Sequence, residues 1–299
     1  MKKIFKALST LALGVMLVSA CNVEHITGTY SPATDGAEVS FVQSVVVNTE
    51  IDPQANTFDV TVARNNPAEA LTVSVSNTFK AGVTVPSSVT FNAGESTAIL
   101  TIDVSAMKIG TQYKGTISIA DESAVNKDVS VVKSSVTLQK VYTWVSQGKG
   151  EWYDNFLFSE PIEVEVLKAE NFNRYRVMNP YPKEVVLEAV GSDWYSGGQS
   201  AYFDFNINED GTVRADSPIK TGAFNASVGA NAYIWYYYPL DYKETQTAQA
   251  ALNKTLEGGK IIQFYHAAMI ENSTSWYGYK ASWLNMPHSA IDLWAWLNE

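Results

Sequence analysis

Tryptophan and tyrosine are the residues of this sequence with the clearest capacity for ligand chemistry. The π-face of an aromatic ring complements the apolar, weakly positive C–H face of a sugar ring, by the same quadrupole that orders aromatic pairs. Several Trp and Tyr residues stand beside Gly, Ser, Asp or Asn in segments that we expect to be loops, where binding residues concentrate. The candidate ligand-binding residues are Trp152, Tyr153, Trp194, Tyr195, Trp276, Tyr277 and Tyr279. For each single ring, packing in the core or at an interface is the alternative, but we expect at least one exposed aromatic cluster.

Residues that could catalyse a reaction are sparse. The histidines His25, His266 and His288 are far apart in the sequence, and no nucleophile elbow, zinc-binding helix or phosphate-binding loop is present. Glu163 and Glu165 would lie about 7 Å apart on one strand face. Glycosidase carboxylates lie about 5 to 10 Å apart, but any charged strand face has this spacing, so a solvated acidic face is expected. We therefore predict no catalytic residue, with a hydrolase as the least favoured alternative.

Metal and cofactor sites are not expected either. The segment from Asn206 to Gly211 is similar to the start of a calcium loop, but the twelfth position is Ser217, where such a loop requires a bidentate acid. Asp210-Gly211 between two alternating runs predicts a hairpin turn instead. Four further acids are expected to be solvated loop residues: Glu50, Asp52, Asp121 and Glu122.

Cys21 is the only cysteine, and it follows a segment with the features of a secretory leader. Three lysines precede an apolar stretch from Ala7 to Val18, which is shorter than the about 20 residues needed to span a bilayer. The run Val18-Ser19-Ala20-Cys21 resembles the bacterial lipobox. This resemblance implies cleavage before Cys21 and lipidation of its thiol, and two or three acyl chains would anchor the protein to the membrane. An ordinary secretory leader with a chance cysteine is the alternative.

The charge and the cysteine content exclude several classes of function. Removal of residues 1–20 takes away three lysines and no acids, so the formal net charge changes from −10 to −13. Such an acidic chain argues against nucleic acid as a partner, because phosphates require a basic face. With Cys21 lipidated, no thiol remains for disulfides, zinc ligation or nucleophilic catalysis. The expected location is the cell envelope, as an outer-membrane lipoprotein that faces either the periplasm or the outside.

The aromatic content divides the chain into two parts. Residues 22–140 contain six aromatic side chains and residues 141–299 contain 29, including all eight tryptophans. An abrupt change of this kind predicts a domain boundary, and the length suits two domains. The expected organisation is a leader at 1–20, the lipidated cysteine and a flexible tether at 21–37, one domain at 38–139 and a second at 141–299.

The first predicted domain consists of short alternating runs separated by turn signals. Phe58 to Val62, Leu71 to Val75 and Ile99 to Val104 are three such runs, and Asn92-Ala93-Gly94 is one of the turns. About seven short strands at this spacing predict a β-sandwich.

Three segments of this domain carry a family resemblance: Phe58 to Arg64, Val85 to Glu95, and Gly110 to Tyr113. With them, residues 38–139 resemble the Calx-beta-like, immunoglobulin-type modules that are common in surface lipoproteins of Bacteroidetes. The resemblance implies a rigid spacer. Some members of the wider family bind calcium through acidic loops, but the loop acids here match no ligand pattern.

The second predicted domain is also β-rich, with one short helix expected from Lys243 to Leu256 because Ala248, Ala251, Leu252 and Leu256 share a face. The strand from Tyr233 to Tyr238 is expected to bury one face and to expose the other. The other expected strands are Ile162 to Val166, Arg174 to Val177, Glu184 to Ala189, Tyr202 to Ile207, Ala223 to Asn225, Ile261 to Tyr265 and Tyr277 to Trp283.

Part of this second domain carries another resemblance, through Gly148 to Phe156, Val164 to Val166 and Tyr175 to Tyr181. Residues 141–215 resemble a C-terminal module of lipoproteins from glycan-uptake loci of the same bacteria. The sequence therefore predicts a mostly β fold, an immunoglobulin-like sandwich followed by an aromatic-rich β domain. The leading functional hypothesis is non-catalytic binding of a glycan or another ligand outside the cytoplasm. A structural or assembly partner of an envelope protein complex is the alternative.

Overall fold

The computed structural model describes residues 37–126, 128, 130–227, 233–271 and 276–299, and only the backbone of Trp276. The expected leader, Cys21 and almost all of the expected tether lie outside the described residues. The chain divides into two compact units, Met1–Gln139 and Lys140–Glu299, and each is described by itself. Among the described residues, no helix is long and apolar enough to cross a membrane.

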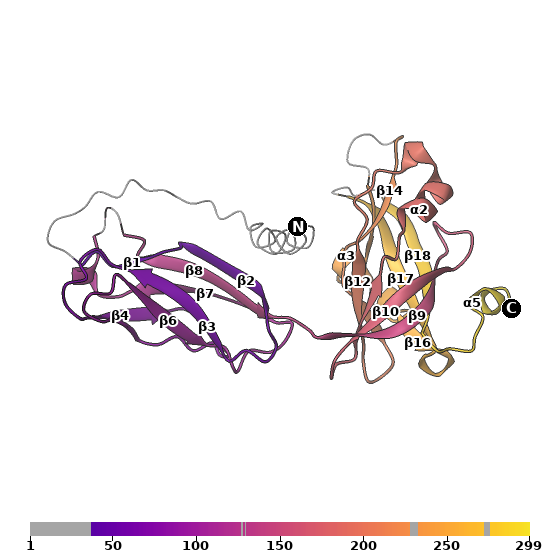
Figure 1. Ribbon diagram of the computed structural model, residues 1–299. Coiled ribbons are helices and arrows are strands. Elements are labelled where there is room, and N and C mark those ends of the chain that lie inside the picture. The colour runs from indigo at the N-terminus through magenta and orange to yellow at the C-terminus, as the bar shows by residue number, and fades with distance from the viewer. Residues whose placement is uncertain (1–36, 127, 129, 228–232, 272–275) are drawn as a thin grey trace, which may run out of the picture. The chain divides into compact units, whose positions relative to one another are not determined.

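The first unit is a β-sandwich of two antiparallel sheets (Figure 1), as the alternating runs predict. One sheet has the strand order β1-β3-β6 and the other has the order β2-β8-β7-β4-β5. The strands are β1 (Ser40–Phe41), β2 (Val45–Ile51), β3 (Thr57–Ala63), β4 (Leu71–Asn77), β5 (Ser88–Phe91), β6 (Thr97–Asp103), β7 (Gln112–Ile119) and β8 (Lys133–Lys140), with a 3-10 turn η1 (Glu122–Ala124). Alternate residues such as Leu100, Ile102 and Leu138 fill a single core, because successive side chains of a strand point to opposite faces.

The second unit is built on one antiparallel sheet with the order β13-β12-β11-β10-β9-β18-β17-β15-β14, and β16 also pairs with β17. Its strands are β9 (Trp144–Asp154), β10 (Ile162–Ala169), β11 (Arg174–Met178), β12 (Tyr202–Ile207), β13 (Val213–Ala215), β14 (Ile219–Phe224), β15 (Tyr233–Tyr237), β16 (Lys254–Leu256), β17 (Ile261–Ile270) and β18 (Trp276–Asn285). The mostly β fold predicted from the sequence is thereby confirmed.

The sheet of the second unit curls so that β13 reaches β16. Val213 N–H donates to the carbonyl oxygen of Asn253 at 2.9 Å, and Thr255 N–H donates to that of Gly211 at 2.9 Å. The curled sheet encloses a core of aromatic and aliphatic residues, of which Trp152, Tyr236 and Phe264 are fully buried. Every second residue of the central strands points into this core, and the residues between them point outward.

The position of the predicted helix is wrong. Of Lys243 to Leu256, only Thr247–Ala250 is helical (α4), and the stretch ends as strand β16. The buried side chain of Asn253 explains the change, because its Oδ1 accepts the N–H of Tyr265 at 3.0 Å and its Nδ2 donates to the Tyr265 carbonyl oxygen at 3.2 Å. Asn253 therefore ties the chain to β17 as a strand neighbour would.

The strand predicted from Glu184 to Ala189 is also wrong, since Lys183–Val190 forms the helix α2. Pro182 precedes the helix and Gly191, at φ +79°, ends it. Val186 is buried and Val190 packs on the same core, so the apolar spacing is helical. The other helical segments of the unit are α3 (Pro239–Tyr242), α5 (Leu293–Leu297) and the 3-10 turns η2 (Ser192–Trp194) and η3 (Glu257–Gly259).

Candidate functional site

Strand β15 carries aromatic residues on both of its faces. Ile234 and Tyr236 are buried in the core, together with Tyr238 just after the strand. Tyr233, Trp235 and Tyr237 lie on the opposite face and are half-buried. The alternation follows the expectation for this strand, and it places three rings on the outer face of the sheet.

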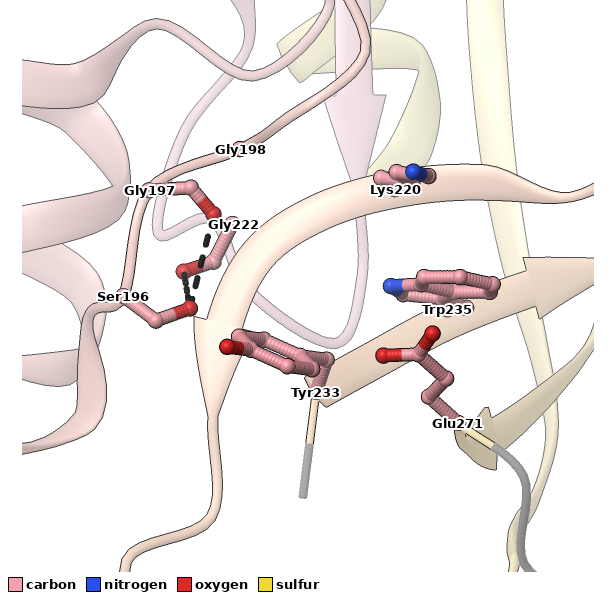
Figure 2. Close-up of a pocket in the computed structure, with 8 residues that line it drawn as sticks. All are labelled: Ser196, Gly197, Gly198, Lys220, Gly222, Tyr233, Trp235 and Glu271. Atoms are coloured by element: carbon pink, nitrogen blue, oxygen red, sulfur yellow. Dashed lines mark hydrogen bonds between the residues drawn. The ribbon is translucent and has the colours of Figure 1, made fainter. Parts of the chain in front are cut away.

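The outward end of β15 lines an open pocket of about 240 Å³ (Figure 2). Two strands, the loop after η2 and the end of β17 contribute to it. The lining residues are Ser196, Gly197, Gly198, Lys220, Gly222, Tyr233, Trp235 and Glu271. The pocket thus combines two aromatic rings, one cation, one carboxylate, one hydroxyl and exposed backbone.

Trp235 is held between charged neighbours. The Lys220 ammonium lies over its ring at 4.7 Å from the centroid, a cation–π contact between adjacent strands. Figure 2 shows the Glu271 carboxylate pointing toward Trp235 from the other side. Burial, and then the charge of Glu271, raises the pKa of the neighbouring Tyr237. The negative charge therefore lies among aromatic rings, where it can accept hydrogen bonds from the hydroxyl groups of a ligand.

Glycines form the wall opposite the aromatic rings. Ser196 donates its N–H to the Gly222 carbonyl oxygen at 3.0 Å and its hydroxyl to the same atom at 3.3 Å (Figure 2). Gly222 has φ +80°, and a Cβ there would lie 3.1 Å from Gln199 Oε1 and 3.4 Å from Tyr195 Cε2. Any larger residue would push this loop away, so the glycine fixes the distance between loop and sheet.

The predicted residues Trp194 and Tyr195 lie next to this pocket. Trp194, in η2, is 41% exposed. Tyr195 pairs by a β-bridge with Ala223 on β14, and its ring packs against Gly222. Neither ring is among the lining residues, but Tyr195 reaches the pocket wall through its contact with Gly222.

The loop position expected for Trp152 and Tyr153 is wrong, because both lie in strand β9. Trp152 is 0% exposed and packs at 5.3 Å and 5.7 Å on Phe203 and Phe264 in the core. Tyr153 points outward and stacks on Trp283 at 6.1 Å. The glycines of β9 suggested a loop, but Gly150 is required by packing, since a Cβ there would lie 2.4 Å from the Asn285 carbonyl oxygen.

The candidates near the end of the chain, Trp276, Tyr277 and Tyr279, lie on strand β18 and not in a loop. The Tyr277 hydroxyl is hydrogen-bonded to Asn225 Nδ2, and its ring packs on Phe156 at 5.6 Å. Tyr279 stacks on Tyr265 at 5.4 Å. The Trp276 side chain lies outside the described residues.

Tyr233 and Trp235 are the pocket residues that sequence reasoning missed as ligand contacts. Their strand is aromatic at almost every position, which favours a core strand. The signal that could have separated them is parity, because Tyr233, Trp235 and Tyr237 must share a face opposite to Ile234.

A second hollow, of about 300 Å³, lies beside the first half of β9 and is polar. It contains Glu151 and Glu163, which face each other across β9 and β10. Glu163 is solvated and pairs with Lys149 at 3.6 Å, while Glu165 accepts a hydrogen bond from Ser146 at 2.9 Å. Among the described residues, no group of three or more His, Cys, Asp or Glu is placed to hold a metal ion.

The core beneath the sheet contains a buried polar network. The Asp154 carboxylate accepts hydrogen bonds from the hydroxyls of Tyr181 at 2.9 Å and Tyr236 at 3.1 Å, and from two backbone N–H groups. Burial raises the pKa of Asp154 despite these donors. His266 is parallel to Tyr236 at 5.1 Å, and burial lowers its pKa to about 3. This network is closed from solvent and stabilises the scaffold under the pocket.

Comparison with known proteins finds solved structures that have low similarity to this chain. No protein-family model and no curated protein sequence matches the chain. Several solved structures are similar to it, among them the following three. A protein of unknown function from Bacteroides ovatus is 10% identical over 87% of this chain and 91% of its own, with a TM-score of 0.33. An auxiliary nutrient binding protein from Bacteroides thetaiotaomicron is 9% identical over 81% and 89%, with a TM-score of 0.33.

The third is the calcium binding domain CBD12 of CALX1.1, which is 12% identical over 47% of this chain and 79% of its own, with a TM-score of 0.30. TM-scores of this size do not transfer a ligand or an activity to the chain.

Proposed function

We propose that the second unit binds a glycan at the pocket beside Tyr233 and Trp235 and does not catalyse its cleavage. The observation that carries the proposal is the composition of that pocket. The Tyr233 ring offers a stacking surface, which complements the C–H face of a sugar. The Trp235 ring beside it is covered on one face by Lys220 and offers its edge and its indole N–H. Lys220 and Glu271 supply a donor and an acceptor at the same place, as the hydroxyl groups of a sugar require.

The number of carboxylates in the pocket supports a site that binds its ligand without cleaving it. Glu271 is the single carboxylate among its lining residues. Glycoside hydrolysis generally needs two carboxyl groups that flank the bond. Glu271 is therefore suited to accept hydrogen bonds and to orient a ligand.

We further propose that the protein is an outer-membrane lipoprotein, anchored through lipid on Cys21. The basic and then apolar N-terminus and the run Val18-Ser19-Ala20-Cys21 support this proposal. An anchored binding protein would hold its ligand near the membrane for transport or degradation by other proteins.

Affinity gel electrophoresis tests the binding proposal. The chain from Asn22 onward, which retains both compact units, is run through gels that contain neutral plant, fungal or bacterial polysaccharides. The expected result is retardation by at least one polysaccharide, reduced about tenfold or more in affinity by Trp235→Ala, because a truncated aromatic anchor commonly costs 2 kcal/mol or more.

Trp144→Ala is the matched control, because Trp144 is the first residue of β9, which is three strands away from β15 in the sheet, and it does not line the pocket. It should bind like the unchanged protein. Retardation that Trp235→Ala leaves unaltered would place the site elsewhere. No retardation by any polysaccharide would refute glycan binding and favour an envelope protein as partner.

A further inference from the structure

Aromatic rings continue from the pocket across the outer face of the sheet. Four adjacent strands, in the order β9-β18-β17-β15, carry half-buried aromatic residues at outward positions. We define the aromatic stripe as Trp235, Tyr237, Tyr265, Tyr279, Trp283 and Tyr153. Its first member is the tryptophan of the pocket, so the stripe and the pocket form one continuous surface.

Strand register brings the middle of the stripe together. Ala267 on β17 is the register partner of both Tyr237 on β15 and Tyr279 on β18. Tyr237 is 6.5 Å from the Trp235 ring. Tyr279 stacks on Tyr265 with an interplanar angle of 18°. Ala267 between them is 0% exposed, so the rings on either side cover it and form the surface at this point.

At the β9 end of the stripe, the rings are also held in defined orientations. Trp283 is the register partner of Tyr153, and the two rings are stacked with an interplanar angle of 18°. Trp283 Nε1–H donates to Gln263 Oε1 at 3.2 Å, which fixes the indole orientation. Trp294 of α5, 43% exposed, borders Tyr153 at 5.6 Å.

The length of the stripe exceeds that of one sugar. Trp235 is level with Met269 on β17, and Trp283 is level with Gln263. These positions are six residues apart, which corresponds to about 20 Å of strand. The stripe also crosses the strands from β15 to β9, each of which lies about 4.8 Å from the next. The surface therefore spans several sugar rings in sequence.

We propose that the aromatic stripe holds an internal segment of an unbranched, neutral polysaccharide, which enters the pocket at Trp235 and lies diagonally across the sheet to Trp283. This inference rests on the proposed function. The row of rings favours a linear chain, because branches would collide with neighbouring rows of side chains. A neutral ligand is favoured because the pocket supplies one positive and one negative charge, Lys220 and Glu271, which balance each other.

The tyrosine hydroxyl groups support a neutral ligand too. The hydroxyls of Tyr153 and Tyr237 are protonated at neutral pH, because burial raises pKa values that already lie near 10. A protonated hydroxyl both donates and accepts a hydrogen bond, which matches the hydroxyls of a sugar chain.

Isothermal titration calorimetry with oligosaccharides of defined length tests the inference. The probes are cello-, xylo-, manno- and malto-oligosaccharides of two to about eight units. The expected result is an affinity that rises with chain length until the stripe is filled. Trp283→Ala should weaken binding of the longest oligosaccharides about tenfold and leave the disaccharide unchanged, whereas Trp235→Ala should weaken both.

Tyr265→Leu is a second variant at the middle of the stripe and should act like Trp283→Ala, and circular dichroism verifies that each variant is folded. Trp144→Ala is the control off the stripe. Affinity that is independent of length and unaffected by Trp283→Ala and Tyr265→Leu would overturn the extended site, while the pocket alone would stand. No binding by any oligosaccharide or polysaccharide would overturn both proposals.

Discussion

The burial of His266 predicts a contribution that destabilises the second unit as the pH falls from 7 to 5. The side chain is 1% exposed and lies parallel to the rings of Tyr236 and Phe264, at 5.1 Å and 5.8 Å. Burial lowers its pKa from 6.5 to about 3. In the unfolded chain the imidazole takes up a proton below pH 6.5, while in the folded protein it stays neutral until about pH 3.

The sign of the effect follows from proton linkage. Between these two pKa values the unfolded state binds one more proton than the folded state, so acid favours unfolding. With pKa values of 6.5 and about 3, the loss from pH 7 to pH 5 is about 2 kcal/mol. The raised pKa of Asp154 acts in the opposite direction, because the folded state then binds the proton more tightly than the unfolded state.

Urea unfolding followed by tryptophan fluorescence measures this quantity. All eight tryptophans lie in the second unit, so the signal reports that unit alone. The free energy of unfolding is compared between the unchanged protein and His266→Phe, which keeps an aromatic ring between Tyr236 and Phe264. Asp154 is present in both proteins, so the difference between them isolates the histidine.

We expect His266→Phe to gain about 2 kcal/mol relative to the unchanged protein between pH 7 and pH 5. His266→Asn serves as a second variant in case phenylalanine overpacks the core, and His288→Gln removes an exposed histidine as a control. Parallel pH profiles for the unchanged protein and both His266 variants would show that the histidine is not held neutral by burial, and the reasoning would fail.

Three further predictions concern the core, the pocket wall and the anchor. Tyr236→Phe removes a hydroxyl that donates to the buried Asp154 at 3.1 Å, and should lower the free energy of urea unfolding by about 1–3 kcal/mol. Gly222→Ala should destabilise by about 1–2 kcal/mol because of its φ of +80°, and should also weaken polysaccharide binding in affinity gels. Gly258→Ala is the control, because Gly258 has φ +67° and open space where its Cβ would be. It should lower the free energy of unfolding by a similar amount and leave polysaccharide binding unchanged. Cys21→Ala should abolish incorporation of labelled palmitate and release the protein from the membrane fraction of a host that processes lipoproteins; continued labelling would refute anchoring at this residue.

Most strands could be predicted because apolar and polar residues alternate along them in the sequence. Phe58 to Val62 lies within a strand that buries Val60 and Val62 on one face. Tyr202 to Ile207 also lies within a strand, although Asp204 is buried between Phe203 and Phe205. The Asp210-Gly211 turn joins β12 to β13, with Asn208 N–H donating to the Thr212 carbonyl oxygen at 2.9 Å. Local patterning and turn chemistry agree in these segments, and neither depends on distant parts of the chain.

The errors arose where a distant contact determines the local structure. Strand β9 contains Gly148 and Gly150, which are typical of loops, but Gly150 is small because the β18 backbone passes 2.4 Å from where its Cβ would be. Asn253 ends the expected helix because it hydrogen-bonds to Tyr265, twelve residues later. Neither contact has a signature within its own segment.

The aromatic content of the sequence indicated that the second unit carries the candidate site, but it did not indicate which rings lie on the outer face. Trp152 and Tyr153 are adjacent in the sequence, yet Trp152 is enclosed by the core and Tyr153 lies on the outer stripe. A strand alternates its faces with every residue, so a change of one position in register would exchange the two rings. The register is defined on one side by β10, where Trp152 pairs with Ile162, and on the other by β18, where Tyr153 pairs with Trp283, 130 residues away.

Both faces of these strands are aromatic, so the hydrophobic pattern that normally reveals the inner face is weak. In β15 an inward Tyr236 stands between an outward Trp235 and an outward Tyr237. Core packing requires large apolar residues on one face only, and a solvated face normally carries polar side chains. Rings retained at outward positions of four neighbouring strands therefore need a second cause. The glycan contact proposed above would supply it, and it predicts that binding is to be sought on the outer face rather than in the loops named from composition.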